Sequence, residues 1–312
     1  MGKMKYFRNT TEIAISEGTV ISLGKFDGLH SGHRYLLQEL LHQKERLGGK
    51  SVIFTFSTPP RDEIEKKKHK VLLTLEEKEF IFEQAGIDYL IEYPFTQDVM
   101  KISAEDFVDM IVKRLNVKAF IVGTDYYFGY QRKGDYHLLE ELSSQYGFDV
   151  IVVNKKQYHG EDISSTLIRN CIKQDNLLLA NELLGFPFFV QGSVEEGNHI
   201  GRTIGIPTIN LLPAEEKLLP SNGVYASTIF VNNQEYKGIT NIGKKPTVGD
   251  DNPIGVETHI FDFNKNVYGQ KVRVTLLEKV RDERKFSSVE ELKNQIQDDI
   301  CRIKAKYYEV VT

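Results

Sequence analysis

The chain has 312 residues, 27% of them charged and 40% hydrophobic, and its formal net charge is -4. The length predicts about two domains, and the composition is typical of an ordinary soluble globular protein. A nearly balanced charge lacks the basic footprint of a nucleic-acid binder, and no apolar run reaches the roughly 20 residues of a membrane span. We therefore expect neither a nucleic-acid polymer nor a membrane as partner.

Two further features concern the cellular compartment. Residues 1–16 contain no apolar segment of the kind found in secretory signals. The two cysteines, Cys171 and Cys301, lie far apart, which argues against a disulfide framework and against a cysteine-based zinc site. These observations predict a cytoplasmic protein, and the sequence carries no indication of its oligomeric state.

The first half of the chain alternates apolar runs with helical patterns. Strands are predicted at 20–23, 51–56, 88–91, 119–122 and 149–153, and helices at 35–47, 74–84, 103–115 and 138–146. Thr74 followed by Glu77 has the spacing of a capping box. This alternation predicts a Rossmann-like α/β domain with a parallel sheet, whose ligands bind beyond the carboxyl ends of the strands. We therefore expect chemistry in the turn from Gly24 to His33.

The second half changes character at Gly185, after a helical stretch at 168–184. Short β-rich runs at 224–231, 256–263 and 271–277 are separated by Gly, Pro and Asn turns, including Asn232–Asn233. A closing helix is signalled by Ser288 followed by Glu291. The pattern predicts a small antiparallel β-barrel with a terminal helix. We expect two domains, 1–185 and 186–312.

The first chemical motif is Gly24-Lys-Phe-Asp-Gly-Leu-His30-Ser-Gly-His33. Two histidines three residues apart at a helix start lie on one side of the first turn. Unpaired N–H groups and a partial positive charge make that helix end a natural phosphate site, and Gly32 allows a close approach to the backbone. The alternative, two surface histidines beside a glycine-rich turn, is weakened by the strand before the motif and the helix after it.

The second motif, Asp162-Ile-Ser-Ser-Thr-Leu-Ile-Arg169, offers hydroxyls at a helix start and a cation one turn later. That combination also suits a phosphate. Taken alone it is weak, because Ser-Ser-Thr is a common N-cap cluster.

The third motif is a glycine-rich stretch in the β-rich half, with Gly192, Gly197, Gly201 and Gly205 leading to Thr208 and Asn210. In an extended chain, Thr208 and Asn210 point to one face. A hydroxyl and an amide oxygen are hard ligands suited to a Mg²⁺ ion shared with ATP. The alternative is a glycine-rich hairpin of a barrel without catalytic function.

Together the motifs resemble, in order, those of the bifunctional riboflavin kinase/FAD synthetase family. The first module matches at 24–33, at Gly123-Thr-Asp-Tyr-Tyr-Phe-Gly129, at 163–169 and at Leu183-Leu-Gly185. The second matches at Gly205-Ile-Pro-Thr-Ile-Asn210, at 223–225, at Asn241-Ile-Gly-Lys-Lys-Pro-Thr247, at 256–263 and at Tyr268-Gly269. The resemblance implies a nucleotidyltransferase domain followed by a riboflavin kinase barrel. It also implies ATP, riboflavin and FMN as small-molecule partners, FAD as a product, and Mg²⁺ as the metal.

The resemblance also implies roles for individual residues. His30 and His33 would bind ATP phosphates and stabilise transfer of AMP, while Glu257 would be the base that faces the ribityl 5′-hydroxyl. Thr208 and Asn210 would hold Mg²⁺. The other ATP-binding residues of the first module would be Gly24, Phe26, Asp27, Gly32, Asp125, Ser164, Thr166 and Arg169. Those that bind ATP or flavin in the second would be Gly197, Gly201, Gly205, Pro207, Thr208 and Asn210.

Two positions depart from the family pattern. The family's T-F-x-P-H-P segment is Thr55-Phe-Ser-Thr-Pro-Pro60, without the histidine, and Tyr127 replaces the usual arginine. These changes keep two alternatives open: a riboflavin kinase with weak or absent adenylyltransferase activity, or a non-enzymatic flavin-binding regulator. The intact His30, His33, Thr208, Asn210 and Glu257 argue against the second.

Overall fold

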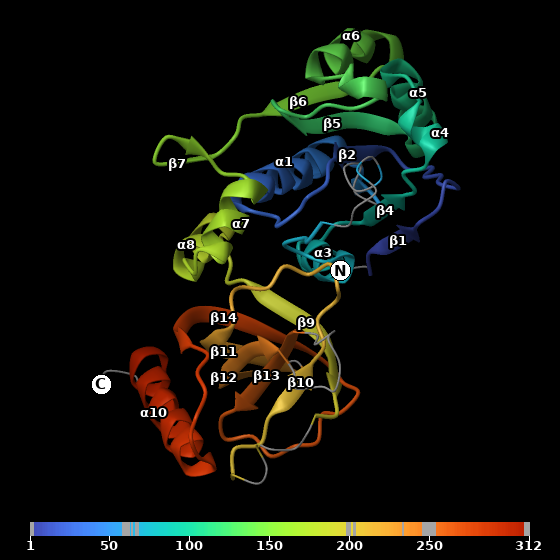
Figure 1. Ribbon diagram of the computed structural model, residues 1–312. Helices are drawn as coiled ribbons and strands as arrows, with labels where there is room; N and C mark the ends of the chain where they lie inside the picture. The colour runs from blue at the N-terminus through green and yellow to red at the C-terminus, as the bar shows by residue number, and fades with distance from the viewer. Residues whose placement is uncertain are drawn as a thin grey trace. The chain divides into compact units, whose positions relative to one another are not determined.

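The computed structural model describes residues 3–57, 63, 65, 69–197, 201, 204–232, 234–244 and 254–308. Residue contacts divide the chain into two compact units, Met1–Ser165 and Thr166–Thr312. The first is an α/β unit and the second contains a barrel, and each is described by itself (Figure 1). In the described part of the chain, no helix has the combination of length and apolar character needed to cross a membrane.

The α/β unit contains one six-stranded parallel sheet with the order β1-β4-β3-β2-β5-β6. Its strands are β1 (Lys5–Arg8), β2 (Thr19–Leu23), β3 (Lys50–Phe56), β4 (Tyr89–Tyr93), β5 (Val117–Gly123) and β6 (Asp149–Val153). The predicted parallel sheet is confirmed. The edge strand β1 was not predicted, because its four residues, KYFR, show no apolar alternation and it depends on pairing with β4.

The predicted helices of this unit begin and end within a few residues of the expected positions, as α1 (Ser31–Leu47), α3 (Leu75–Gln84), α5 (Ala104–Leu115) and α6 (Tyr136–Tyr146). The short helix α4 (Gln97–Met100) and the 3₁₀ turn η1 (Tyr130–Arg132) were not predicted. The capping box of α3 is present, since the Thr74 hydroxyl accepts from the Glu77 N–H and the Glu77 carboxylate accepts from the Thr74 N–H.

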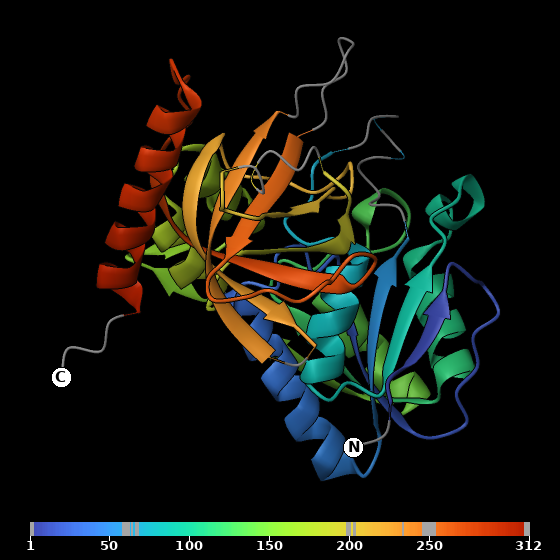
Figure 2. The same ribbon diagram turned by 90° about the horizontal axis from the view of Figure 1, so that it is seen from below.

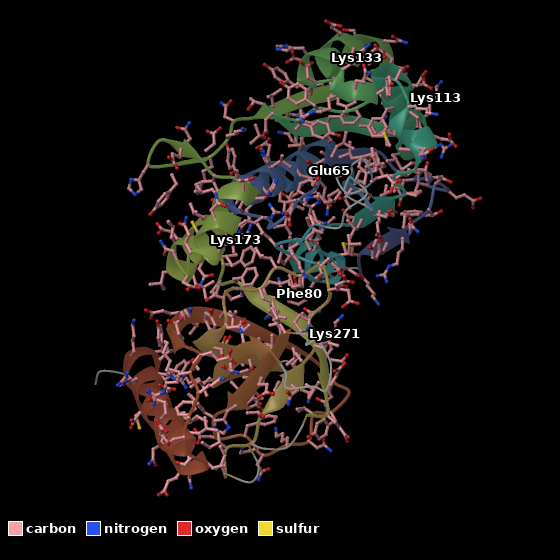
Figure 3. All side chains as sticks on the ribbon, viewed as in Figure 1. Glu65, Phe80, Lys113, Lys133, Lys173 and Lys271 are labelled. Carbon is pink, nitrogen blue, oxygen red and sulfur yellow. The ribbon has the colours of Figure 1, made fainter. Side chains whose placement is uncertain are left out.

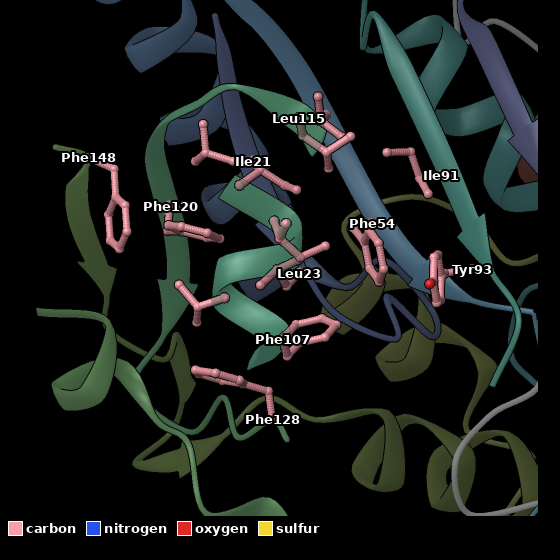
Figure 4. Close-up of a cluster of buried hydrophobic side chains, with 14 of the residues drawn as sticks. Ile21, Leu23, Phe54, Ile91, Tyr93, Phe107, Leu115, Phe120, Phe128 and Phe148 are labelled. Atoms are coloured by element: carbon pink, nitrogen blue, oxygen red, sulfur yellow. The ribbon is translucent and has the colours of Figure 1, made fainter. Parts of the chain in front are cut away.

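The main core of the α/β unit lies on one face of the sheet. Phe107 of α5 packs edge-on against Phe54 of β3, next to Ile21 and Phe120 (Figure 4). α1 packs on the opposite face, against β2 and β5. From β2 the chain runs outward to β3 and β4, and then crosses to β5 on the other side of β2. The carboxyl ends of β2 and β5 therefore mark the topological switch point, where open α/β sheets bind ligands.

The second unit contains a closed antiparallel barrel with the order β10-β13-β12-β11-β14-β9. Its strands are β9 (Phe189–Glu195), β10 (Ile209–Leu211), β11 (Gly223–Val231), β12 (Gln234–Lys244), β13 (Ile254–Ile260) and β14 (Lys271–Asp282). The terminal helix α10 (Val289–Tyr307) lies along the barrel (Figure 2), with Ile300 and Ile303 packed against Val224 and Ala226. The predicted barrel and terminal helix are confirmed.

The helical stretch predicted at 168–184 is two helices, α7 (Ser165–Lys173) and α8 (Leu177–Leu184). Asp175 adopts a left-handed φ of 60°, and Asn176 caps α8 through the Leu179 N–H. α8 belongs to the barrel unit by contact, because Asn181 donates to the Leu276 and Leu277 carbonyls of β14. The contact division falls at Ser165, whereas the boundary at residue 185 stays a prediction.

Candidate active sites

The turn after β2 contains two residues with side chains in the left-handed backbone conformation, which glycine adopts more easily. Phe26 and Leu29 both adopt left-handed conformations, with φ of 47° and 44°. Each such residue costs about 1–3 kcal/mol and persists where the surroundings impose it. Here Phe26 is fully buried, its ring 5.7 Å from that of Phe82 in α3 and 5.5 Å from the His33 imidazole. A Cβ on Gly24 would lie 3.2 Å from the Phe26 ring, so packing accounts for this glycine.

His30 and His33 form a stacked pair at the start of α1, with ring centroids 3.9 Å apart. His30 is the N-cap residue, and no side-chain hydrogen bond caps the helix. Among the described residues, neither Nδ1 atom has a hydrogen-bond partner although both are buried. A Cβ on Gly32 would lie 3.2 Å from Nδ1 of His30, so this glycine gives room to the imidazole. Two unpartnered buried nitrogens at a helix N-terminus are suited to an anionic ligand.

Burial controls the charge of the two imidazoles. It lowers the pKa of His30 to about 4, a shift that the carboxylates of Asp27 and Asp125 partly oppose. Burial, followed by the neighbouring His30 and by Lys78, lowers the pKa of His33 to about 3. Both rings are therefore neutral at pH 7, and each acts as a hydrogen-bonding group.

Asp27 connects three segments that are far apart in the sequence. Its Oδ1 accepts from the Leu72 N–H at 2.9 Å, and its backbone carbonyl accepts from the Ser165 hydroxyl at 2.6 Å. The Ser165 bond brings the start of the second motif onto the first. The sequence motifs predicted both segments as phosphate sites but did not predict this contact.

Asp125 follows β5 and so lies on the other side of the switch point. Its carboxylate pairs with Lys155 at 3.2 Å, and Lys155 also pairs with Asp162 at 3.2 Å. A Cβ on Gly123 would lie 3.1 Å from Oδ1 of Asp125. The influence of Asp125 on the His30 pKa shows that the predicted residues after β2 and β5 share one electrostatic environment.

The remaining predicted residues of this site are only partly described. Ser164 is half-buried, while Thr166, exposed, and Arg169, half-buried, lie on α7 beyond the contact division, so their part in the site stays a prediction. Thr58–Pro60 lie outside the described residues. Tyr127 is 47% exposed, and the Arg132 guanidinium lies 4.9 Å from its ring centroid.

The barrel positions its predicted residues in a cross-strand row. In the strand register, Glu257 of β13 lies opposite Asn210 on one side and Asn241 on the other, and Asn210 also lies opposite Glu195 of β9. Directly paired residues have Cβ atoms about 4.5–5.5 Å apart on one face. Asn210 is 5% exposed, and its Oδ1 is buried without a hydrogen-bond partner among the described residues. Asn241 and Glu195 were not predicted as neighbours, because strand register cannot be read from a single motif.

Two glycines of the third motif are explained by the atoms they face. A Cβ on Gly197 would collide with Nδ2 of Asn210, and a Cβ on Gly201 would collide with the carbonyl oxygen of Ile206 and lie 3.4 Å from Oγ1 of Thr208. Gly201 also accepts from the Ile206 N–H at 2.8 Å, and Gly205 has a left-handed φ of 78°. Gly197 therefore makes room for the Asn210 side chain, whereas Gly201 makes room for the backbone of Ile206.

A cavity of about 480 Å³ lies next to Thr208, and its lining residues Ile209 and Thr258 alternate along β10 and β13 with Asn210 and Glu257. It is lined by Pro207, Thr208, Ile209, Thr258, Ile260, Phe263, Asn264, Lys265, Asn266, Val267 and Tyr268. Pro207 is held by a 2.8 Å hydrogen bond between its carbonyl and Nδ1 of His259. A volume of this size fits a ring-bearing small molecule. The apolar side chains of the lining could pack against such a ring, and the side-chain amides of Asn264 and Asn266 could hydrogen-bond to its polar atoms.

The two units thus present two separate constellations suited to phosphate chemistry. One lies at a switch point of a parallel sheet, and the other lies beside a cavity of a closed barrel. An α/β nucleotide-type site joined to a barrel with hard oxygen donors defines a two-module transferase.

Comparisons with known proteins identify the family. A model of the FAD synthetase family matches residues 12–167, and a model of the riboflavin kinase family matches residues 184–307. The bifunctional riboflavin kinase/FMN adenylyltransferase of Escherichia coli K12 is 37% identical over 289 residues, covering 92% of each chain. That of Haemophilus influenzae is 35% identical over 296 residues, covering 93% of this chain and 95% of the relative.

A solved structure agrees along the whole length. The crystal structure of a protein described as a macrolide-efflux protein from Streptococcus pneumoniae has a TM-score of 0.84 and 30% identity. It covers 97% of this chain and 99% of its own. The chain belongs to the bifunctional riboflavin kinase/FMN adenylyltransferase family. It is an enzyme that phosphorylates riboflavin to FMN and adenylylates FMN to FAD.

Proposed function

We propose that adenylyl transfer takes place at the switch point of the α/β unit, around His30 and His33. The observation that carries this proposal is the stacked, buried pair of imidazoles whose Nδ1 atoms have no partner among the described residues. In the reaction, a phosphate oxygen of FMN attacks the α-phosphorus of ATP. The bond from that phosphorus to the β-phosphate bridging oxygen breaks, and pyrophosphate leaves. The imidazoles donate hydrogen bonds to the oxygens on which negative charge develops.

Riboflavin phosphorylation belongs, in this proposal, to the row that contains Asn210 and Glu257. The Glu257 carboxylate takes the proton of the ribityl 5′-hydroxyl as that oxygen attacks the γ-phosphorus of a separate ATP, and ADP leaves. Support comes from the register, which sets Glu257 directly opposite Asn210. The adjoining cavity at Thr208 has room for the ring system of a substrate.

The residues at this row also fit a magnesium ion. The buried Oδ1 of Asn210 is a hard oxygen donor without a partner among the described residues, and glycines at 197 and 201 leave room beside Asn210 and Thr208. Thr208 and Asn210 would hold the ion, which when bound would neutralise charge on ATP phosphates. The chain's own part is to align the hydroxyl and to accept its proton.

Product analysis tests the assignment. Purified enzyme is incubated with riboflavin and ATP, with and without Mg²⁺, and the flavins are separated by chromatography. We expect both FMN and FAD with Mg²⁺, and loss of FMN formation when the metal is chelated. FMN without FAD would select the alternative with an impaired adenylyltransferase, and the absence of both products would contradict the two-site assignment.

Two broader expectations accompany the proposal. A domain boundary at residue 185 is supported by the riboflavin kinase family model, whose match begins at residue 184, and proteolysis of the chain tests it. A cytoplasmic location is supported by Cys171 and Cys301, which are both free thiols.

A further inference from the structure

Lys78 extends from the first turn of α3 toward the glycine turn of the adenylyl-transfer site. Its ammonium donates to the Lys25 carbonyl oxygen at 3.3 Å. The Thr74–Glu77 capping box fixes the start of α3, and the contact of Phe82 with Phe26 holds the helix against the turn. The ammonium is therefore held at this turn by a defined helix rather than by a free surface loop.

The two carboxylates that act on Lys78 accept hydrogen bonds from other groups, which leaves donor positions of the ammonium for a ligand. The Asp27 carboxylate already accepts from the Leu72 N–H, and Glu92, buried in β4, accepts from the Tyr6 hydroxyl at 2.6 Å. An ammonium has three donor positions, and among the described residues its hydrogen bond goes to the Lys25 carbonyl. Burial lowers the pKa of Lys78, while Asp27 and Glu92 oppose the shift and favour the charged form.

Burial lowers the pKa of both neighbouring histidines, which favours their neutral forms at pH 7. Adenylyl transfer brings the phosphate of FMN to the phosphates of ATP, and both are anionic. Neutral imidazoles offer hydrogen bonds but do not offset this repulsion. Lys78 and His33 contact neighbouring residues of one turn, since the ammonium donates to the Lys25 carbonyl and the Phe26 ring lies 5.5 Å from the His33 imidazole.

We propose that Lys78, held at the turn beside the two histidines, is a further phosphate-contacting residue of adenylyl transfer, whose ammonium offsets negative charge on the reacting phosphates. The proposal rests on the location of adenylyl transfer at His30 and His33. Lys78 would contact an oxygen of the reacting phosphates while the FMN oxygen bonds to the α-phosphorus and pyrophosphate departs. The ammonium keeps its proton throughout and acts by its charge.

The test compares Lys78→Met and Lys78→Arg in the full-length enzyme, with Lys113→Met as the matched control. Lys113 lies on α5, with its side chain 67% exposed (Figure 3). For Lys78→Met we expect kcat/KM for FAD formation from FMN and ATP to fall about 100-fold, mainly in kcat. Lys78→Arg should restore activity to within about tenfold of the wild type, and Lys113→Met should change little. Riboflavin phosphorylation by the same molecules should be unchanged.

The following results distinguish a role of Lys78 in phosphate contact from a structural role and from a misplaced site. FAD formation by Lys78→Met within about threefold of the wild type would overturn the proposal, as would equal impairment of the Met and Arg variants. If Lys78→Met unfolds in a circular-dichroism melt, Lys78→Gln, which keeps a donor for the Lys25 carbonyl, replaces it. Unchanged FAD formation in His30→Ala would instead show that the adenylyl-transfer site itself is misplaced.

Discussion

The proposed phosphate sites of the α/β unit and of the barrel unit are built from different kinds of structure. In the α/β unit, the groups come from segments far apart in sequence, such as His30 after β2, Asp125 after β5 and Lys78 on α3. In the barrel, Asn210 and Glu257 are neighbours in one antiparallel register. The first site therefore depends on how loops and helix ends meet, whereas the second depends on strand pairing and on glycines that make room.

The donor chemistry differs in the same way. The switch-point site offers nitrogen donors, from two neutral imidazoles and an ammonium, and these can contact phosphate oxygens directly. The barrel row offers carboxylate and amide oxygens, which require a cation before they can face a phosphate. If the proposed sites are correct, the two phosphate reactions use different donor groups, and variants should impair them independently.

The largest difference between the effects on the two reactions is expected for Glu257→Gln. Removal of the general base should lower kcat for riboflavin phosphorylation about 1000-fold, because a positioned base contributes about 10²–10⁴-fold. FAD formation from supplied FMN should be unchanged. Steady-state assays of each half-reaction measure this, with the exposed Glu235 of β12 changed to Gln as control. A comparable loss in both reactions of a folded variant would mean that the two sites are not separate.

The reciprocal change is His30→Ala. We expect FAD formation to fall about 100- to 1000-fold, as is typical for removal of one preorganised donor, while FMN formation stays within about twofold. His42→Ala on the same helix is the control, since that side chain is 68% exposed. The assignment of the histidine pair to adenylyl transfer fails if His30→Ala and His42→Ala make FAD equally well.

These residues also indicate how much of each candidate site could be predicted from the sequence. His30, His33 and Glu257 lie in local motifs, so the sequence singles them out, and the role of Glu257 is implied by the family resemblance. Lys78 and the Ser165–Asp27 contact were not predicted, because they depend on where α3 and a distant loop meet the turn after β2. Asn241 belongs to one of the sequence motifs, but its position opposite Glu257 is known only from the pairing register of β12 and β13.

The elements of the fold were likewise predicted where they leave a local signal in the sequence. Strands with apolar runs and helices with capping pairs, such as Ser103 with the Asp106 N–H, were predicted within a few residues. The edge strand β1 and the break at Asp175 were missed. The first is stabilised by pairing with β4 and the second by a left-handed residue, and neither leaves a local signal.

A third prediction concerns pH and only the α/β unit. The pKa of His33 is lowered from 6.5 to about 3 in the folded state, so between these values the unfolded chain binds more protons. Stability contributed by this residue is therefore present above about pH 6.5 and is lost as the pH falls toward 3. From pH 7 to pH 5 the loss should be about 2 kcal/mol.

Thermal melts of the wild type and of His33→Gln from pH 7.5 to pH 5 measure this effect. The difference in Tm should move in favour of His33→Gln by a few degrees as the pH falls, because glutamine takes up no proton. His42→Gln should follow the wild type. Parallel Tm curves for the wild type and His33→Gln would show that His33 is not held neutral by burial.

The smallest effect should come from Gly197→Ala in the barrel. An added Cβ would lie 2.2 Å from Nδ2 of Asn210, so that side chain must turn away from its present position. Because Asn210 can rotate part of the way, we expect kcat/KM for riboflavin phosphorylation at limiting Mg²⁺ to fall only about tenfold, with FAD formation unchanged. Gly192→Ala on β9 is the control, since its Cβ would make ordinary contacts at 3.6 Å. If both alanine variants phosphorylate riboflavin equally well, the close approach of Gly197 to Asn210 does not position the metal ligand.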